Sequence, residues 1–215
     1  MKFALLALSM PLAGCISVLP KPPPAPLVFP LAAADAPAPS VAASPIVIAV
    51  ERPGTPRALS GADIVWMKDG HIAYIDGVTW DGRAPDQLQT LLVRTIDRSG
   101  GAKGAVRAGE GHADSILSLD LAEFGIVEDG GLEARFTGHA NLFTPRDRRL
   151  IAALEINEHE PLKDRSSSAA AAALQGVART AATKLATWAA AQTPLPTAEA
   201  AAPVDRPRTG GRRRP

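Results

Sequence analysis

The sequence predicts an α+β fold in two layers, in which a mostly antiparallel sheet has two helices packed on one face. Three observations lead to this prediction. Short runs that alternate between apolar and polar residues indicate strands, and two runs with apolar residues at helical spacing indicate helices. The order along the chain is strands, helix, strands, helix, which favours a sheet covered on one side. The alternation indicates that one face of the sheet is buried and the other faces water.

The first half of the predicted domain contains a strand, a hairpin and a helix. Residues 46–51 are rich in β-branched side chains and lie between prolines, which is typical of a strand. Residues 63–67 and 71–75 flank an Asp-Gly pair, which favours a tight hairpin. Pro85 suits a first helical turn, and the helix that follows has four regularly spaced apolar residues and two glycines at its end (Leu88, Leu91, Leu92, Ile96, Gly100 and Gly101).

The second half contains three strands and a long helix. Residues 117–121 alternate, and the pattern then slips near residues 123–124, which indicates a β-bulge. Residues 132–142 and 150–156 alternate in the same way. Serines at 166–168 offer an N-cap to a long, alanine-rich helix. The polar face of the middle strand consists of four side chains (Arg135, Thr137, His139 and Asn141).

The glycine-rich segment at residues 100–111 lies between the two halves. It lacks the Gly-Lys-Ser/Thr ending of a phosphate-binding loop and does not open a helix. The sequence therefore predicts a flexible connection here.

Charge and cysteine content exclude several classes of protein. The formal net charge of the 215-residue chain is +1, but residues 46–191 are mildly acidic and the C-terminal segment is basic. Residues 46–191 have no dense basic stripe of the kind that duplex nucleic acid requires. The chain has one cysteine, so it can form neither an internal disulfide nor a multi-cysteine zinc site.

Candidate catalytic and metal-binding residues are sparse. The four histidines (His71, His112, His139 and His159) are far apart in sequence, and His112 with Asp114 is a weak candidate for a pair of metal ligands. The chain has no helical His pair of a zincin and no Gly-x-Ser-x-Gly turn. We therefore predict a protein that is not an enzyme, with no catalytic, cofactor-binding or metal-binding residues.

The N-terminus has the order of a secretory signal. Lys2 precedes an apolar run at residues 3–12, and Ala13 and Gly14 precede Cys15. The run is about half the ~20 residues of a transmembrane helix. The residues alone also allow an ordinary signal peptide with a chance cysteine, or a buried N-terminal helix.

Leu12-Ala13-Gly14-Cys15 resembles the lipobox of bacterial lipoproteins. The resemblance implies cleavage before Cys15, a diacylglyceryl group on its sulfur and a fatty acid such as palmitate on its amine. Two or three acyl chains hold a protein at a membrane, whereas one binds only reversibly. Cys15 is then the lipidation site.

The resulting boundaries divide the chain into four parts. Residues 1–14 are a lipoprotein signal peptide, and residues 15–45 are a lipidated cysteine with a proline-rich tether. The tether is either a semi-rigid polyproline II spacer of ~3.1 Å per residue or a linker without a required length. Residues 46–191 are the folded domain. Residues 192–215 are a disordered basic tail, which either contacts anionic headgroups or is simply solvated.

The order of features resembles the ABC-type transport auxiliary lipoprotein component family, the PqiC/YmbA-like proteins. The lipobox is followed by a strand, residues 63–65 before the hairpin, and a Trp80-x-x-x-x-Pro85 entry to a helix. A strand with Phe124, a meander, and a helix that ends in Leu185-x-x-Trp188 complete the series. Members often have Tyr-x-Leu soon after the cysteine. Here a proline-rich spacer replaces it, so no docking role is carried over from that segment.

This resemblance implies a non-catalytic, periplasm-facing partner of an ABC transporter and an MCE-domain protein that moves lipids between envelope membranes. It implies no nucleic-acid partner and no cofactor. Ile16, rather than aspartate, follows Cys15, which implies the outer membrane rather than the inner. Trp80 and Trp188 are expected in the core. The alternative is a structural or assembly-chaperone envelope lipoprotein without a transporter partner.

The polar face of residues 132–142 is the candidate docking region for the MCE partner. An exposed edge or face of a sheet can accept a partner by strand addition or face docking. The same side chains are equally consistent with a merely solubilising surface.

Overall fold

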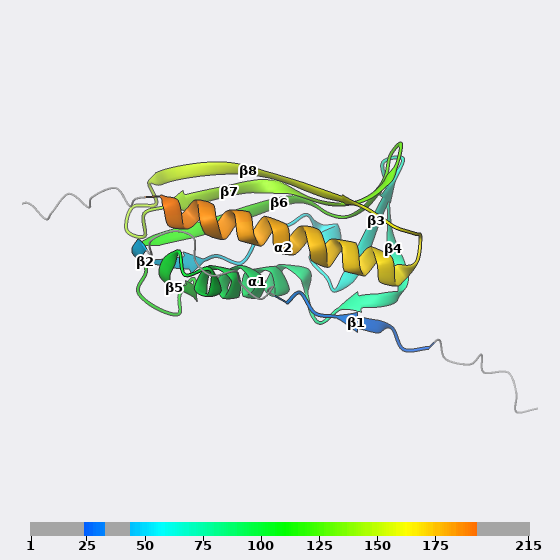
Figure 1. Cartoon of the computed structure of the whole chain (residues 1–215), viewed down its shortest axis with the longest axis horizontal. Coiled ribbons are helices and arrows are strands. Elements are labelled where there is room, and N and C mark those ends of the chain that lie inside the picture. The colour runs from blue at the N-terminus through cyan, green and yellow to red at the C-terminus, as the bar shows by residue number, and fades with distance from the viewer. Residues whose placement is uncertain (1–23, 33–43, 193–215) are drawn as a thin grey trace, which may run out of the picture.

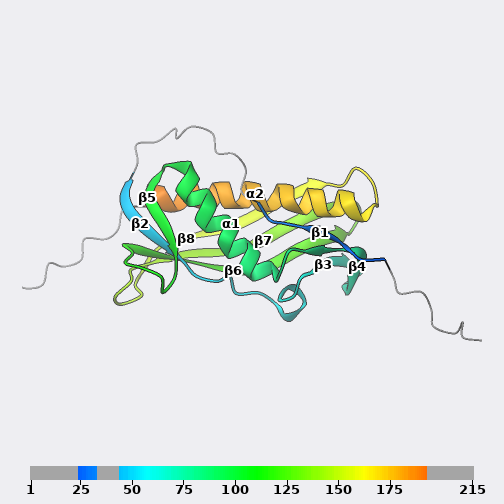
Figure 2. The same ribbon diagram turned by 90° about the horizontal axis from the view of Figure 1, so that it is seen from below.

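Helices α1 and α2 lie side by side on one face of a single open sheet (Figures 1 and 2). The computed structural model describes residues 24–32 and 44–192. In these ranges the chain forms eleven elements, which are β1 (Leu27–Phe29), β2 (Ser44–Val50), the 3-10 helix η1 (Arg57–Leu59), β3 (Asp63–Lys68), β4 (His71–Trp80), α1 (Ala84–Ser99), β5 (Ala102–Arg107), β6 (Ser115–Glu128), β7 (Leu132–Phe143), β8 (Leu150–Pro161) and α2 (Ser167–Ala191). The two-layer α+β prediction is confirmed.

Strand β6 organises the sheet. One edge of β6 pairs antiparallel with β7, and β7 pairs antiparallel with β8. The other edge pairs in parallel with β2 near the start of β6 and with β3 near its end. Residues 51–62 connect β2 to β3 along this edge of β6, and a single bridge between Gly54 and Asp120 joins them to it. The long ladders are therefore antiparallel, as predicted, while β2 and β3 add parallel pairings that the alternation does not indicate.

The core lies between the sheet and the two helices. Trp80 stacks on Phe124 with ring centroids 5.4 Å apart, and Phe136 meets Phe124 edge-on at 5.6 Å. Most of the buried residues of α2 are alanines, so this helix packs closely on the sheet. Trp188 packs against the same core. Trp80 is therefore buried in the core, as predicted, whereas Trp188 is only partly buried against it.

Local signals for turns and helix ends are confirmed. Asp69 and Gly70 have φ values of 48° and 75°, as a two-residue hairpin turn of type I′ requires. Gly100 ends α1 with φ of 64°. The Ser166 hydroxyl accepts a hydrogen bond from the Ala169 N–H at 3.2 Å and caps α2.

The predicted bulge in β6 is also present, between Leu121 and Glu123. Gly138 lies opposite it on β7. A Cβ atom at Gly138 would lie 2.4 Å from the Asp120 carbonyl oxygen, so the bulge requires glycine at this position.

The prediction of a flexible connection at residues 100–111 is wrong. Ala102–Arg107 forms β5, which pairs in parallel with β2. The Asp97 carboxylate accepts a hydrogen bond from the Ala105 N–H at 2.6 Å. Glycine and alanine leave this segment without alternation, so its strand conformation depends on β2 and α1 rather than on its own residues.

Part of the proline-rich segment joins the sheet. Leu27–Phe29 forms β1 and pairs in parallel with β4, and Leu31 is 4% exposed in the core. Prolines flank β1, which is tolerated because β1 is an edge strand. The described residues include neither the predicted signal peptide nor Cys15. Of the predicted tether they include only residues 24–32 and 44–45, and of the predicted basic tail only residue 192.

Within the described ranges, no helix has both the length and the apolar character needed to cross a bilayer.

Candidate docking face

The side of the sheet opposite the helices, here called the outer face, carries the candidate docking residues. On β7, Ala134, Phe136 and Ala140 are buried on the helix side. The alternate residues point the other way and are exposed or half-buried, which confirms the predicted polar face (Arg135, Thr137, His139 and Asn141). This face is therefore free of the core and accessible to a partner.

A shallow hollow of about 320 Å³ lies on the outer face. Strands β6, β7 and β8 together form its lining (Glu123, Glu133, Arg135, Thr137, Asn157 and His159). Register places these side chains side by side, because Arg135 pairs with His159 and Thr137 pairs with both Glu123 and Asn157. Two of the four predicted residues, Arg135 and Thr137, line the hollow, whereas His139 and Asn141 lie beyond it.

Charges of both signs meet in the hollow. The Arg135 Nε donates to a Glu133 carboxylate oxygen. This bond, followed by the nearby carboxylate charges, raises the pKa of Arg135, although partial burial opposes the shift. The Thr137 hydroxyl donates to Glu123 at 3.4 Å. The hollow thus offers a permanently charged guanidinium, two carboxylates and a hydroxyl for polar recognition.

The four histidines do not form a chemical site with one another. They are all exposed, on β4, on the loop before β6, on β7 and on β8 (His71, His112, His139 and His159). Asp114, the possible partner of His112, accepts the Val47 N–H at 2.8 Å and so holds β2. Across the described residues, no cluster of three or more His, Cys, Asp or Glu side chains could hold a metal ion.

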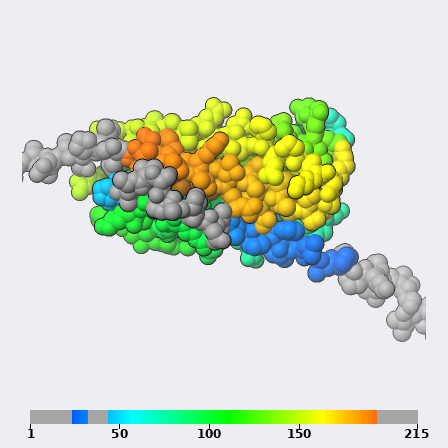
Figure 3. Space-filling view, viewed as in Figure 1, coloured from blue at the N-terminus to red at the C-terminus, as the bar shows by residue number. Residues whose placement is uncertain are grey.

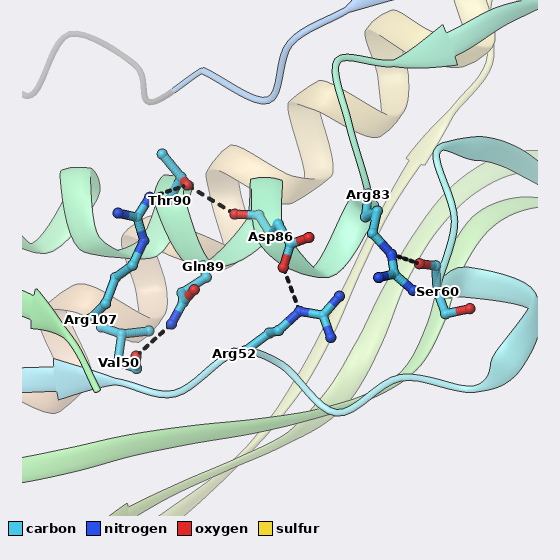
Figure 4. A network of polar contacts seen from close by, with 8 residues as sticks. All are labelled: Val50, Arg52, Ser60, Arg83, Asp86, Gln89, Thr90 and Arg107. Carbon is cyan, nitrogen blue, oxygen red and sulfur yellow. Dashed lines mark hydrogen bonds and ion pairs between the residues drawn. The ribbon is translucent and has the colours of Figure 1, made fainter. Parts of the chain in front are cut away.

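Polar residues around α1 are used to hold the fold together. Arg52 pairs with Asp86, and the Gln89 amide donates to the Val50 carbonyl at 3.0 Å (Figure 4). Arg107 donates to the Thr90 hydroxyl at 3.0 Å. These contacts fasten the segment after β2 and the edge strand β5 to α1, and the sequence did not indicate them.

A second ionic group joins the β3–β4 hairpin to the loop before α2. The Glu128 carboxylate accepts hydrogen bonds from Arg165 at 2.8 and 3.1 Å and from Lys68 at 3.1 Å. These two cations, Arg165 first, lower the pKa of Glu128 to about 2. The group ties together three segments that are far apart in sequence.

The open edge of β8 borders the outer face. Among the described residues, β8 pairs with β7 alone. From Glu155 onward the strand carries three glutamates and ends in a proline, features that discourage uncontrolled strand pairing (Glu155, Glu158, Glu160 and Pro161). Its first four residues, from Leu150 to Ala153, carry no charge.

Comparison with protein families identifies the chain's relatives. A family model described as the ABC-type transport auxiliary lipoprotein component matches residues 29–186, from the end of β1 into α2. The chain belongs to this family. Membership confirms the resemblance seen in the sequence, and it implies a lipid-anchored position in the cell envelope and an ABC transporter as partner.

Solved structures share the fold at low sequence identity. Protein XCC0632 from Xanthomonas campestris superposes with a TM-score of 0.69 at 22% identity, over 76% of this chain and 94% of that one. An uncharacterized protein superposes with a TM-score of 0.61 at 14% identity, over 76% and 97%. No curated protein sequence matches the chain. At these identities the structures are evidence for the fold alone.

Proposed function

We propose that the chain is a non-catalytic auxiliary lipoprotein of an MCE/ABC-type intermembrane lipid transport system. The observation that carries the proposal is the family match over residues 29–186. The exposed and mutually distant histidines support a role without catalysis. In this function Cys15 is the acylated N-terminus, and the domain faces the periplasm.

The outer face is the proposed docking surface for the MCE-domain partner. Its polar side chains are free of the core, and the hollow presents charges of both signs for recognition. The adjoining edge of β8 can add a strand from the partner, with backbone hydrogen bonds for affinity and side chains for selectivity.

Affinity purification of the full-length acylated protein from its own membranes tests the function. We expect an ABC permease, its ATPase and an MCE-domain protein in the eluate, because an auxiliary component has to contact the transporter. An unrelated lipoprotein purified in parallel is the control. Recovery of outer-membrane assembly components in place of these proteins would favour the alternative, a structural or assembly-chaperone lipoprotein.

The membrane to which the protein is sorted has its own test. We propose the outer membrane, because Ile16 rather than aspartate follows Cys15. Sucrose-gradient fractionation should recover the protein with outer-membrane markers, and Ile16→Asp should move it to the inner membrane. Recovery of the native protein with inner-membrane markers contradicts the assignment.

A further inference from the structure

Exposed apolar side chains are concentrated on two neighbouring strands. Among the described residues, five large hydrophobic side chains are exposed, and four of them are between 53% and 61% accessible on β1 and β4 (Leu27, Val28, Ile72 and Tyr74). Single exposed apolar residues are ordinary on a protein surface. Two of them lie on β1, which pairs with the last residues of β4, and two lie near the start of β4. Their concentration on these two strands is the feature that needs a cause.

The β3–β4 hairpin presents part of this surface as one continuous apolar strip. Met67 pairs with Ile72, and Val65 pairs with Tyr74, so these four side chains lie on the same side of the hairpin. Val127 of β6 pairs with Met67 and extends the strip. Within the strip, Val65 and Val127 are buried, while Ile72 and Tyr74 face water.

Strand β1 and the hairpin lie at the same end of the domain. Figures 1 and 2 place β1, β3 and β4 together at one end, and Figure 3 shows β1, in blue, on the surface there. The strand register agrees with this placement of the hairpin at one end, because Lys68 at the hairpin tip pairs with Glu128 at the end of β6. Phe143, which leads into the β7–β8 turn, pairs with Ile116 at the opposite end of β6.

The chain also leads from this end toward the proposed anchor. Leu27 follows Cys15 by twelve residues. Even fully extended, that length spans only ~40 Å. Strand β6, with 14 residues, is itself ~45 Å long. An acylated Cys15 therefore keeps the β1 end within ~40 Å of the bilayer, whereas the β7–β8 turn can lie about twice as far away.

We propose that the β1–β4 end of the domain rests on the bilayer surface, with Val28, Ile72 and Tyr74, which the register places on one side of the sheet, in contact with lipid. The proposal rests on the acylation of Cys15, and it adds an orientation to the proposed function. Isoleucine and valine suit the acyl boundary, and the tyrosine ring suits the interface because its hydroxyl remains hydrated. The opposite end of the domain then points into the periplasm.

Fluorescence quenching in vesicles tests this orientation on the full-length acylated protein. A thiol-reactive fluorophore is attached at His71→Cys beside the hairpin tip or, as the matched control, at Arg146→Cys in the β7–β8 turn; both positions are exposed. The vesicles contain phosphatidylethanolamine, phosphatidylglycerol and a doxyl-labelled phosphatidylcholine. We expect quenching about twofold or more stronger at position 71, because an interfacial face lies within ~5–10 Å of the acyl boundary. Equal quenching at the two positions overturns the proposal.

A second set of variants tests the side chains themselves. Ile72→Thr with Tyr74→Thr keeps β propensity on an exposed surface and should abolish the extra quenching at position 71. Leu150→Thr, at a 50% exposed residue on β8, is the control and should preserve it. If the double variant keeps the quenching but loses the transporter or changes the assembly size, the strip binds protein and the proposal is overturned.

Mass spectrometry of the same samples separates this inference from the proposed function. Acylated Cys15 with equal quenching at both labels overturns the orientation alone. A free Cys15 thiol overturns the anchor and the orientation together.

Discussion

The two faces of the sheet use the same strands for opposite purposes. On β7, Phe136 is 2% exposed beneath the helices, whereas its neighbour Arg135 lines the hollow on the outer face. The inner face is aliphatic and aromatic, and the outer face carries charges and hydrogen-bonding groups. Because alternate residues serve the core and the surface, one strand can keep its stability while its exposed side chains adapt to a partner.

The largest expected effect is on the inner face. Phe136→Ala should lower the free energy of unfolding by about 3–5 kcal/mol, because it opens a cavity beside Phe124. Urea denaturation measures the loss. The exposed His139→Ala on the same strand is the control and should change stability by less than about 0.5 kcal/mol. Similar losses for the two variants would contradict the division between the faces.

A smaller effect is expected where the inner face meets the bulge. Gly138→Ala should cost about 1–3 kcal/mol, because its Cβ would lie 2.4 Å from the Asp120 carbonyl oxygen and the backbone would have to move. Gly131→Ala is the control, since no atom lies within 4 Å of the added Cβ. Thermal melting of both proteins checks this, and equal melting temperatures would show that the bulge accommodates a side chain.

The ionic group at the hairpin end predicts an acid response. The pKa of Glu128 is lowered from 4.5 to about 2 in the folded protein, so its contribution to stability is complete above pH ~4.5 and is lost as the pH falls toward ~2. Glu128→Gln should therefore be less stable than the native protein near neutral pH, with a difference that shrinks across this window. Urea midpoints between pH 7 and 2 measure it.

The variant Arg165→Gln provides a second check of this acid response. It removes the first partner of Glu128 and should reduce the same pH dependence. Parallel pH curves for the native and Glu128→Gln proteins would be evidence against the ionic contribution.

The smallest effect on stability is expected on the outer face. Arg135→Glu should lower the free energy of unfolding by about 1 kcal/mol, because it breaks the ion pair with Glu133 and adds a third carboxylate to the hollow, and it should reduce co-purification with the MCE-domain partner. Arg149→Glu makes the same charge change in the β7–β8 turn, outside the hollow, and should leave co-purification intact. If Arg135→Glu leaves co-purification unchanged, the outer face is not the docking surface.

Local sequence signals predicted most of the fold. Strand parity, the Asp-Gly hairpin, the serine cap and the bulge each depend on neighbouring residues, so a single sequence reveals them. Strand β5 and strand β1 were not predicted, because a Gly/Ala-rich segment and three residues between prolines become strands only when β2 and β4 are beside them. The parallel pairing of β2 and β3 with β6 is likewise set by contacts distant in sequence.

The candidate docking face was predicted only in part, because some of its residues are brought together by contacts distant in sequence. Arg135 and Thr137 follow from the alternation of β7. Glu123, Asn157 and His159 come from the neighbouring strands, and only the register between strands places them in the same hollow.

The short pairing of β1 has a mechanical consequence. Three residue pairs join β1 to β4, and β1 is the first described element after the proposed anchor, so a force applied from the membrane acts on this contact before it acts on the core. Detaching β1 and Leu31 would free residues 27–32, which span ~20 Å when extended, and would leave the pairing of β2 through β8 intact. Under tension, the connection to the membrane would therefore lengthen by detachment of β1, while the rest of the domain stays folded.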